Sequence, residues 1–255
     1  MTRHTHTVDV TGIVFELSCP FPKPGFWARR QPAFISRRRP DVTVRIDYEE
    51  RLERHPWRSI GDTVADAPSV RRRGGRLVVS TGYYRASVDV SRGRAAVRIA
   101  AGFDVAALMR TLAALWLAER ATLLLRAACF ESAGAATLAC GLPGSVLAPS
   151  ASLGWLAVTT GDDGVLVRPT PFLDRLGPLR ARGRRVTALW LPGSREGQPP
   201  GPAEALRALL PSIWHADRRR AAVERTLDLA TRIVTALPCR GISATDHMRD
   251  EAAVG

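Results

Sequence analysis

Three short segments in the first hundred residues have strand-like composition, and turn-forming residues separate them. The segments are residues 76–81, 83–90 and 95–99, with Gly82 between the first two and residues 91–94 (Ser-Arg-Gly-Arg) between the last two. Such segments are typical of strands, and glycine at such spacing is typical of tight hairpin turns. The pattern predicts an antiparallel β-meander, so this part of the chain must bury one face of a sheet.

The remainder of the first hundred residues also indicates strands. Residues 8–17 have strand-like composition, and residues 42–48 alternate apolar and polar side chains. Residues 21–40 mix aromatic residues, prolines and arginines without a period, which predicts an exposed but ordered loop. We therefore expect a β-rich N-terminal module over residues 1–100.

The second part of the chain mixes helices and strands. A wide apolar stripe predicts a helix that begins near Asp104, and apolar runs at 122–130 and 136–140 predict two strands. Further strands are expected at residues 154–160, 164–168, 186–191 and 238–242, and amphipathic helices at 202–213 and 218–237. This order predicts an α+β or α/β domain over residues 101–245, followed by a polar tail at 246–255.

Composition narrows the class of protein. A chain of 255 residues with 45% hydrophobic residues can bury a core, and no run of 18 apolar residues predicts a membrane span. The N-terminus lacks a hydrophobic segment of signal-peptide type, so we expect a cytoplasmic protein. Neither cysteines nor histidines have metal-ligand spacing, which predicts no metal centre and mostly buried, reduced thiols at Cys19, Cys129, Cys140 and Cys239.

The net charge of +13 is concentrated near the N-terminus, where residues 1–100 hold 19 basic and 10 acidic side chains. Lys23 is the one lysine, and this skew resembles codon composition as much as selection for phosphate binding. Arginine clusters beside proline or glycine predict loops, at Arg29-Arg30, Arg37–Arg39 and Arg71–Arg73. Solvated loops, an acidic protein partner and nucleic acid are the alternatives, with nucleic acid least favoured because no recognised motif is present. The candidate partner contacts are Phe26, Trp27, Arg29, Arg30, Arg37, Arg38 and Arg39.

Several motifs in the second part occur in a recognisable order. They are Leu123-Leu-Leu-Arg-Ala-Ala128, Gly141-Leu-Pro-Gly144, Val167-Arg-Pro-Thr-Pro-Phe172, the helical segment 202–210 and Leu237-Pro-Cys239. Their order and spacing resemble the C-terminal domain of the HPr kinase/phosphorylase superfamily, and most closely its diverged kinase-like members of peptide-modification pathways, including lasso-peptide kinases. The resemblance implies a P-loop-type, PEP carboxykinase-like domain that would bind ATP and Mg²⁺.

The residues that would hold the nucleotide depart from this pattern. A working P-loop, GxxxxGK[ST], supplies backbone N–H groups and a lysine to the phosphates and a hydroxyl to Mg²⁺, with a helix behind it. Residues 141–147 read GLPGSVL, without the lysine, and Pro149 and Gly154 leave a short segment for the helix. Relatives have histidine where Arg126 stands. Gly141, Gly144, Ser145 and Arg126 therefore form a degenerate nucleotide site.

An acidic pair, Asp162-Asp163, could replace the missing base and magnesium ligand of the family. The pair is flanked by Gly161 and Gly164 between two predicted strands, so we favour a hairpin turn over a metal site. Thr159 and Thr160 then take the place of the family's acidic residues.

The sequence thus predicts a non-catalytic pseudokinase without a cofactor, which serves as a binding or scaffold subunit for a peptide or partner protein of a peptide-maturation pathway. The first alternative is an atypical kinase that uses ATP and Mg²⁺ to phosphorylate a serine or a precursor-peptide terminus. The second is a nucleic-acid-binding protein that uses the N-terminal arginine clusters. Relatives are commonly oligomeric, which leaves a homo-oligomer open.

Overall fold

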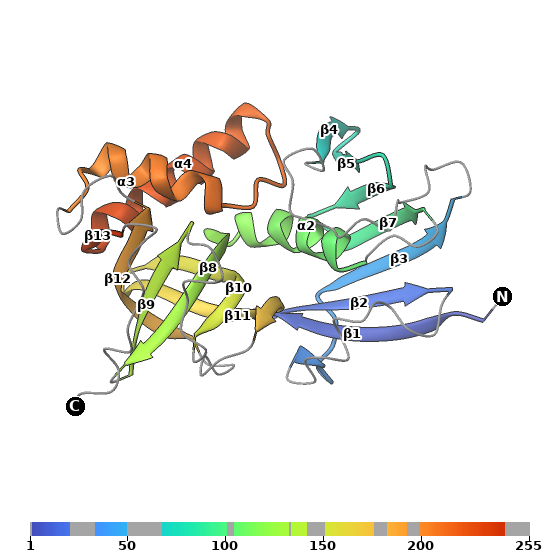
Figure 1. The fold of residues 1–255 in the computed structure, drawn as a ribbon. Helices are drawn as coiled ribbons and strands as arrows, with labels where there is room; N and C mark the ends of the chain where they lie inside the picture. The colour runs from blue at the N-terminus through green and yellow to red at the C-terminus, as the bar shows by residue number, and fades with distance from the viewer. Residues whose placement is uncertain are drawn as a thin grey trace. The chain divides into compact units, whose positions relative to one another are not determined.

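The computed structural model of the chain (Figure 1) describes residues 2–20, 34–49, 68–100, 105–132, 134–141, 151–175, 183–192 and 199–242. The fold is mixed α/β and mostly β, with two sheets. Packing divides it into an N-terminal unit, Met1–Trp116 with His215–Val223, and a C-terminal unit, Leu117–Trp214 with Glu224–Gly255. The predicted boundary near residue 100 rests on composition and family resemblance, and it stays a prediction.

A seven-stranded sheet forms most of the N-terminal unit. In spatial order its strands are β1 (His4–Val10), β2 (Ile13–Cys19), β3 (Val42–Tyr48), β7 (Arg94–Ile99), β6 (Tyr84–Asp89), β5 (Arg76–Ser80) and β4 (Ser69–Arg73). The strands β5, β6 and β7 are antiparallel neighbours, which confirms the predicted meander. Strand β3 lies parallel to both β2 and β7, so the sheet is mixed.

The first strand-like segment, residues 8–17, is a hairpin instead of a single strand. Strands β1 and β2 are antiparallel, and Val10 lies opposite Ile13. The two residues between them, Thr11 and Gly12, have φ values of 54° and 94°. Positive φ at both central residues produces the tight turn whose twist suits a two-residue hairpin. The sequence hides this turn because threonine rarely adopts positive φ.

The prediction that Arg71–Arg73 lies on a loop was wrong, because these arginines belong to β4. Gly74 and Gly75 have φ values of 54° and 80° and close a two-residue hairpin in which Arg73 lies opposite Arg76. The glycine pair thus marks a turn between two strands, and it does not extend a loop to the arginines. By contrast, Arg37–Arg39 are exposed and lie outside the strands, as predicted.

The apolar face of this sheet packs against α2 (Val105–Ala118), the helix expected after residue 103. Tyr84 Oη donates a hydrogen bond to Thr111 Oγ1 at 3.2 Å, and Trp116 Nε1 donates to the Val90 carbonyl at 3.2 Å. The Trp116 ring also meets Phe15 edge to face, with ring centroids 5.7 Å apart. Burial raises the pKa of Tyr84 to about 12, so this phenol stays neutral at physiological pH.

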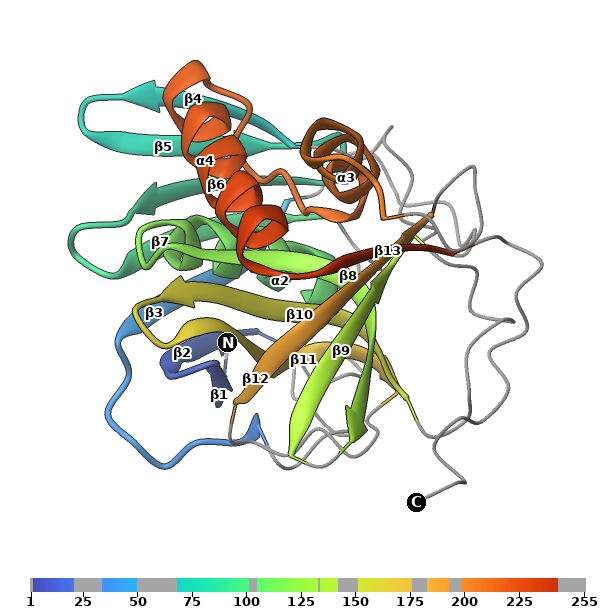
Figure 2. The ribbon, with the colours of Figure 1, turned by 90° about the vertical axis from the view of Figure 1, so that its left-hand side faces the viewer.

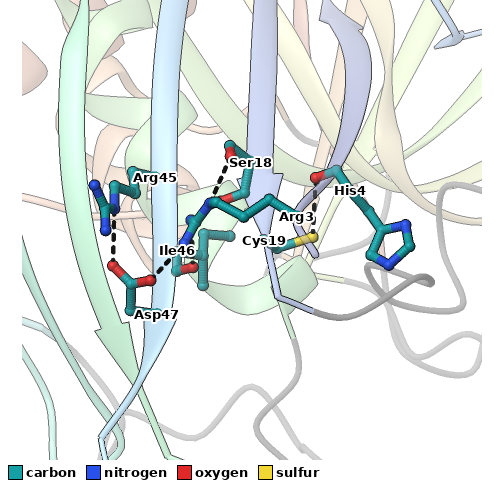
Figure 3. A network of polar contacts seen from close by, with 7 residues as sticks. All are labelled: Arg3, His4, Ser18, Cys19, Arg45, Ile46 and Asp47. Atoms are coloured by element: carbon teal, nitrogen blue, oxygen red, sulfur yellow. Dashed lines mark hydrogen bonds and ion pairs between the residues drawn. The ribbon is translucent and has the colours of Figure 1, made fainter. Parts of the chain in front are cut away.

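Arg3 fastens the ends of β2 and β3 to each other (Figure 3). Its guanidinium donates hydrogen bonds to Ser18 Oγ at 2.9 Å, to the Ser18 carbonyl at 2.7 Å, to the Ile46 carbonyl at 2.9 Å and to Asp47 Oδ1 at 2.7 Å. Arg45 Nε donates to the other oxygen of Asp47 at 3.1 Å. Partial burial alone would raise the pKa of Asp47, but the hydrogen bonds from Arg3 and Arg45 outweigh it and lower the pKa.

A six-stranded sheet forms the C-terminal unit. In spatial order its strands are β11 (Gly164–Arg175), β10 (Ser152–Gly161), β8 (Thr122–Ser132), β9 (Ala135–Cys140), β12 (Arg184–Pro192) and β13 (Cys239–Ile242). The β8–β9 and β10–β11 hairpins confirm the predicted strand pairs. Strand β11 also pairs with β12, so the sheet curls until its first five strands form a ring. Strands β9, β12 and β13 run parallel.

Helices lie between β12 and β13 in the chain. They are α3 (Pro202–Leu209), a 3₁₀ turn at Leu210–Ser212 and α4 (Arg220–Ala236), which confirms the helices predicted there. The apolar face of α3 and α4 shares one core with the strands, through buried Leu209, Leu229, Ala230, Ile233 and Val234. A helical crossover is the usual way to join parallel strands such as β12 and β13. None of the described helices is long and apolar enough to cross a membrane.

We expect Arg3→Ala to lower the free energy of unfolding by about 1–2 kcal/mol, because two carbonyls and Asp47 lose a charged donor. Arg45→Ala is the matched control: its side chain is 67% exposed and contacts only Asp47 in this network, so a loss below about 0.5 kcal/mol is expected. Urea denaturation of both variants at pH 7 measures the difference. Equal losses in the two variants would contradict the role given to Arg3.

The effect of Arg3→Ala also depends on pH. Because Arg3 lowers the pKa of Asp47 in the folded state, the stabilisation is complete above the ordinary carboxyl pKa of 3.8 and is lost as the pH falls through the lower, folded value. The difference in unfolding free energy between the native protein and Arg3→Ala is expected to shrink below about pH 4. A difference that grows on acidification would be inconsistent with this linkage.

Candidate functional site

Gly141 directly follows β9, at the edge of the sheet where the parallel strands end. Strand β12 ends beside it, and a Cβ added at Gly141 would lie 3.0 Å from Cγ of Pro192. The backbone of Gly141 has a φ of 69°, which favours glycine. In α/β sheets, ligands bind outside the carboxyl ends of parallel strands. Gly141 therefore occupies the place where the loop of a phosphate site begins in such a sheet.

Arg126 lies on β8 next to Gly141. Ala127 pairs with Cys140 in the antiparallel β8–β9 ladder, so Arg126 and Gly141 come at the next position of the same ladder. The structure thus brings together these two predicted site residues. The other two, Gly144 and Ser145, lie outside the described residues.

The Arg126 side chain has a carboxylate neighbour that sequence reasoning missed. Its Nη2 lies 3.9 Å from Oδ2 of Asp174, near the end of β11, and both side chains are exposed. No local pattern links the two residues, because a shift in the β10–β11 register brings the end of β11 to this place. Arg126 is therefore a cation beside an anion, which offsets its charge toward a phosphate.

The chain returns to the sheet soon after Gly141. Strand β10 begins at Ser152 and pairs with β8 without interruption, from Ser152 opposite Cys129 to Thr159 opposite Thr122. Only ten residues separate Gly141 from Ser152. A P-loop and the helix behind it need more, because an average helix alone has about 11 residues. The interval is therefore too short for the sequence of a P-loop followed by a full helix.

Gly154 brings β10 into close contact with β11. A Cβ added at Gly154 would lie 2.6 Å from the backbone nitrogen of Asp174 and 2.7 Å from Cα of Leu173, and its φ is 132°. The β10–β11 register shifts on both sides of this residue. The sequence predicted a strand over residues 154–160 and used Gly154 as a limit on the space for a helix. The structure confirms the strand: Gly154 lies within β10, at a point that only glycine fits.

Aromatic side chains pack near Arg126. Trp155, which pairs with Arg126 in the β8–β10 ladder, is 5% exposed, and its ring meets Trp214 edge to face with centroids 5.3 Å apart. The Trp214 backbone N–H donates a hydrogen bond to the Leu124 carbonyl at 2.9 Å. Trp155 and Trp214 are thus packing residues.

The acidic pair Asp162-Asp163 forms the two-residue turn between β10 and β11, in which Gly161 lies opposite Gly164. This confirms the hairpin interpretation. The turn lies about 20 Å along β10 from Trp155, the neighbour of Arg126, because each strand residue advances the chain by about 3.3 Å. These carboxylates therefore cannot share a metal ion with a phosphate held at Gly141. In the described part of the chain, no group of three or more His, Cys, Asp and Glu residues could hold a metal ion.

The thiol next to Gly141 is unsuited to nucleophilic chemistry. Cys140 is fully buried, and burial raises its pKa to about 12; burial and, secondarily, the charge of Glu131 raise the pKa of Cys129 to about 12. The reactive form of cysteine is the thiolate, which is scarce at neutral pH when the pKa is this high. All four cysteines are free, and only Cys239 is partly exposed, which confirms the expected buried thiols.

A basic surface covers the solvent side of the N-terminal sheet. Strands β3 to β7 carry eight arginines and two aspartates, and all eight arginines are exposed. The strand registers place seven of them on the face opposite the apolar core, which we call the arginine face: Arg45, Arg71, Arg73, Arg76, Arg85, Arg94 and Arg98. Sequence reasoning missed this surface because it assigned arginine clusters to loops.

Only part of the arginine face is neutralised. Ion pairs join Arg45 to Asp47 at 3.1 Å, Arg76 to Asp89 at 3.9 Å and Arg98 to Glu49 at 3.9 Å. Within the described ranges, no carboxylate lies within 4 Å of the guanidinium groups of Arg71, Arg73, Arg85 and Arg94, or of Arg72 on the opposite side of β4.

The predicted partner contacts in residues 21–40 are only partly placed by the structure. Arg37, Arg38 and Arg39 are exposed. Arg38 donates a hydrogen bond to the Gly12 carbonyl at 3.1 Å and lies within 4 Å of the carboxylates of Asp9 and Asp41. These contacts are within the protein and stabilise the segment that carries Arg38. Phe26, Trp27, Arg29 and Arg30 lie outside the described residues. No protein-family model matches the chain, and no curated protein matches it.

We expect Gly154→Ala to lower the free energy of unfolding by about 2–4 kcal/mol, because the new methyl group meets the β11 backbone and the residue keeps a positive φ. Gly161→Ala is the control, since a Cβ added there meets nothing within 4 Å. A change below about 0.5 kcal/mol is expected for it. Chemical denaturation measures both values, and a Gly154 variant as stable as the control would contradict the close β10–β11 contact.

We expect Cys129 and Cys140 to resist thiol reagents in the native protein, because both are buried and their pKa values are near 12. Titration with a disulfide reagent at pH 8 is expected to modify Cys239 first, and all four thiols only in denaturant. Mass spectrometry of the labelled peptides identifies the modified residue. Rapid labelling of Cys140 in the folded state would disprove its burial.

Proposed function

We propose that this chain is a non-catalytic member of the HPr kinase-like superfamily, a pseudokinase that serves as a binding or scaffold subunit for a peptide or partner protein. One observation carries the proposal: only ten residues separate Gly141, at the expected start of the phosphate loop, from Ser152, the first residue of β10. The start of β10 at Ser152 is well defined, because eight residues of this strand, from Ser152 to Thr159, pair with β8.

The order of elements supports the proposed superfamily. The Leu123–Ala128 motif lies in β8 and precedes β9, which ends at Cys140 just before Gly141, and the segment 202–210 begins with helix α3. Parallel strands β9, β12 and β13 with helices between the last two give this unit an α/β part. We accordingly propose a PEP carboxykinase-like domain over residues 101–245 with a degenerate P-loop.

The chemistry around Gly141 supports a non-catalytic role. Arg126 is beside Asp174, and the acidic pair Asp162-Asp163 lies about 20 Å away along the strand. Removing one contact to transition-state charge typically costs about 2.7–4 kcal/mol. A site that lacks the P-loop lysine, the hydroxyl and a nearby acidic pair would lose several such contacts, enough to abolish useful phosphoryl transfer.

The arginine face supports a binding role and favours a protein over nucleic acid. Asp47 and Asp89 lie among its arginines, and carboxylates at these places oppose a phosphate backbone. In the registered rows of strands β3 to β7, its remaining positions hold small or aliphatic residues such as Ala96 and Ser87, and no aromatic ring on which a base could stack. We place the partner in a peptide-maturation pathway because of the family resemblance.

A titration with Mg·ATP tests the non-catalytic part of the proposal. A nucleotide present at 100 times its Kd would stabilise the fold by about 2.7 kcal/mol and raise Tm by about 5–10 °C. We expect no shift in Tm for the native protein or for Arg126→Ala, and no release of phosphate. A saturable rise in Tm that Arg126→Ala abolishes would overturn the proposal and favour the atypical kinase.

A further inference from the structure

Strand β4 forms one end of the N-terminal sheet, and its outer edge has no strand partner among the described residues (Figure 2). It pairs with β5 alone, from Ser69 opposite Ser80 to Arg73 opposite Arg76. At the opposite end of the sheet, β1 meets the chain again through a bridge between Val8 and Ile35. A free strand edge presents N–H and C=O groups that can pair with another extended chain.

The register identifies which backbone groups point outward. In a two-residue hairpin, the residues that flank the turn exchange hydrogen bonds with each other, and this arrangement alternates along the strand. Here Arg73 flanks the turn, so Arg73, Arg71 and Ser69 bond to β5. The N–H and C=O groups of Val70 and Arg72 therefore point away from the sheet and can accept a further strand.

The same short strand carries a dense positive charge. Three of its five residues are Arg71, Arg72 and Arg73, and all three are exposed. Alternation places Arg71 and Arg73 on the arginine face and Arg72 on the other side. No carboxylate among the described residues lies within 4 Å of them, so the charge on both sides of this edge is available to a ligand.

We propose that β4 is a docking site for an acidic, extended segment of a partner protein, which adds to the sheet as an eighth strand beside β4. The proposal rests on the binding role proposed above and specifies the surface and the chemistry of the partner. Backbone hydrogen bonds to Val70 and Arg72 hold the segment, and its carboxylates pair with the arginines.

The spacing of a sheet fits this arrangement. An added strand lies about 4.8 Å from β4, and side chains directly opposite have Cβ atoms about 4.5–5.5 Å apart. Acidic residues at alternate positions of the segment can therefore meet Arg71 and Arg73 together, while the residue between them meets Arg72. Guanidinium groups bind carboxylates with two parallel hydrogen bonds, which rewards this alignment.

Other occupants fit the edge less well. A second copy of the chain, paired through the same strand, would set arginines against arginines, and like charges directly opposite destabilise a sheet. Single-stranded nucleic acid needs aromatic platforms for its bases, and neither β4 nor β5 contains an aromatic residue. Charged edge strands also discourage unwanted pairing, so β4 selects for a strand of opposite charge.

Fluorescence anisotropy with two labelled heptapeptides tests the proposal on the full-length chain. The probe alternates Glu and Thr, and the comparison peptide alternates Glu and Pro. The two have the same charge, but proline removes the N–H groups that a strand needs. We expect the Glu-Thr peptide to bind at least about tenfold more tightly than the Glu-Pro peptide, with an affinity that falls as salt is added.

Matched variants locate the site. Arg71→Ala/Arg73→Ala is expected to weaken Glu-Thr binding about threefold to tenfold, the sum of two exposed cross-strand ion pairs. Arg85→Ala/Arg94→Ala removes the same charge from exposed arginines on central strands whose edges are both occupied, and is expected to change the affinity less than about twofold. Val70→Pro is expected to weaken binding more than Val70→Ala, because it also removes an outward N–H. Circular dichroism confirms that each variant is folded.

Three results would overturn the docking site: equal affinity for both peptides, equal effects of the two double-arginine variants, or tighter binding of a labelled oligothymidylate with the same dependence on Arg71 and Arg73. The last result would indicate a nucleic-acid surface. None of them bears on the Mg·ATP titration, so the docking site can fail while the non-catalytic proposal stands. Conversely, nucleotide binding would overturn the non-catalytic role and leave the peptide result intact.

Discussion

The contact of Gly154 with the β11 backbone is the constraint on which the C-terminal unit depends. At this point β10 lies between two partners, β8 and β11, and the β11 backbone approaches so closely that a Cβ would come within 2.6 Å of it. The chain that leaves β9 at Gly141 must therefore return in time to enter β10 at Ser152. The ten residues between Gly141 and Ser152 are too few for a phosphate loop with a full helix, because the residues that follow belong to β10.

The sequence predicts the elements that have a local cause. Strand-like segments and turn glycines indicate the β5–β7 meander, and the acidic pair between Gly161 and Gly164 indicates its own turn, because these signals lie within a few residues. The sequence did not predict the hairpin at Thr11-Gly12, because apolar residues lie on both sides of the turn and threonine at positive φ is rare. The sequence did not predict strand β4, because three successive arginines show no alternation of apolar and polar residues. This strand forms through its pairing with β5.

The sequence shows which residues the candidate site contains but not what they contact. The absence of lysine after Gly141 and the short interval before the next predicted strand can be read in the sequence alone. The Arg126–Asp174 contact cannot, because it depends on the shifted β10–β11 register that Gly154 permits. The packing of Trp155 on Trp214 likewise joins residues far apart in the chain. The neighbours of a site residue therefore depend on the register between strands that are distant in the sequence, which the sequence does not show.

The positions of the arginines in the fold carry information that the amino-acid composition does not. Of the 37 basic residues 36 are arginine, but this composition does not determine where their partners lie. Arg45, Arg76 and Arg98 each have an aspartate or glutamate within reach, whereas the described residues supply none to Arg71, Arg72 and Arg73 on the same sheet. Solvent alone can accommodate exposed arginines. Three of them lie on a strand whose outer edge has no partner among the described residues, and the acidic strand proposed above would satisfy their charge and the backbone hydrogen bonds together.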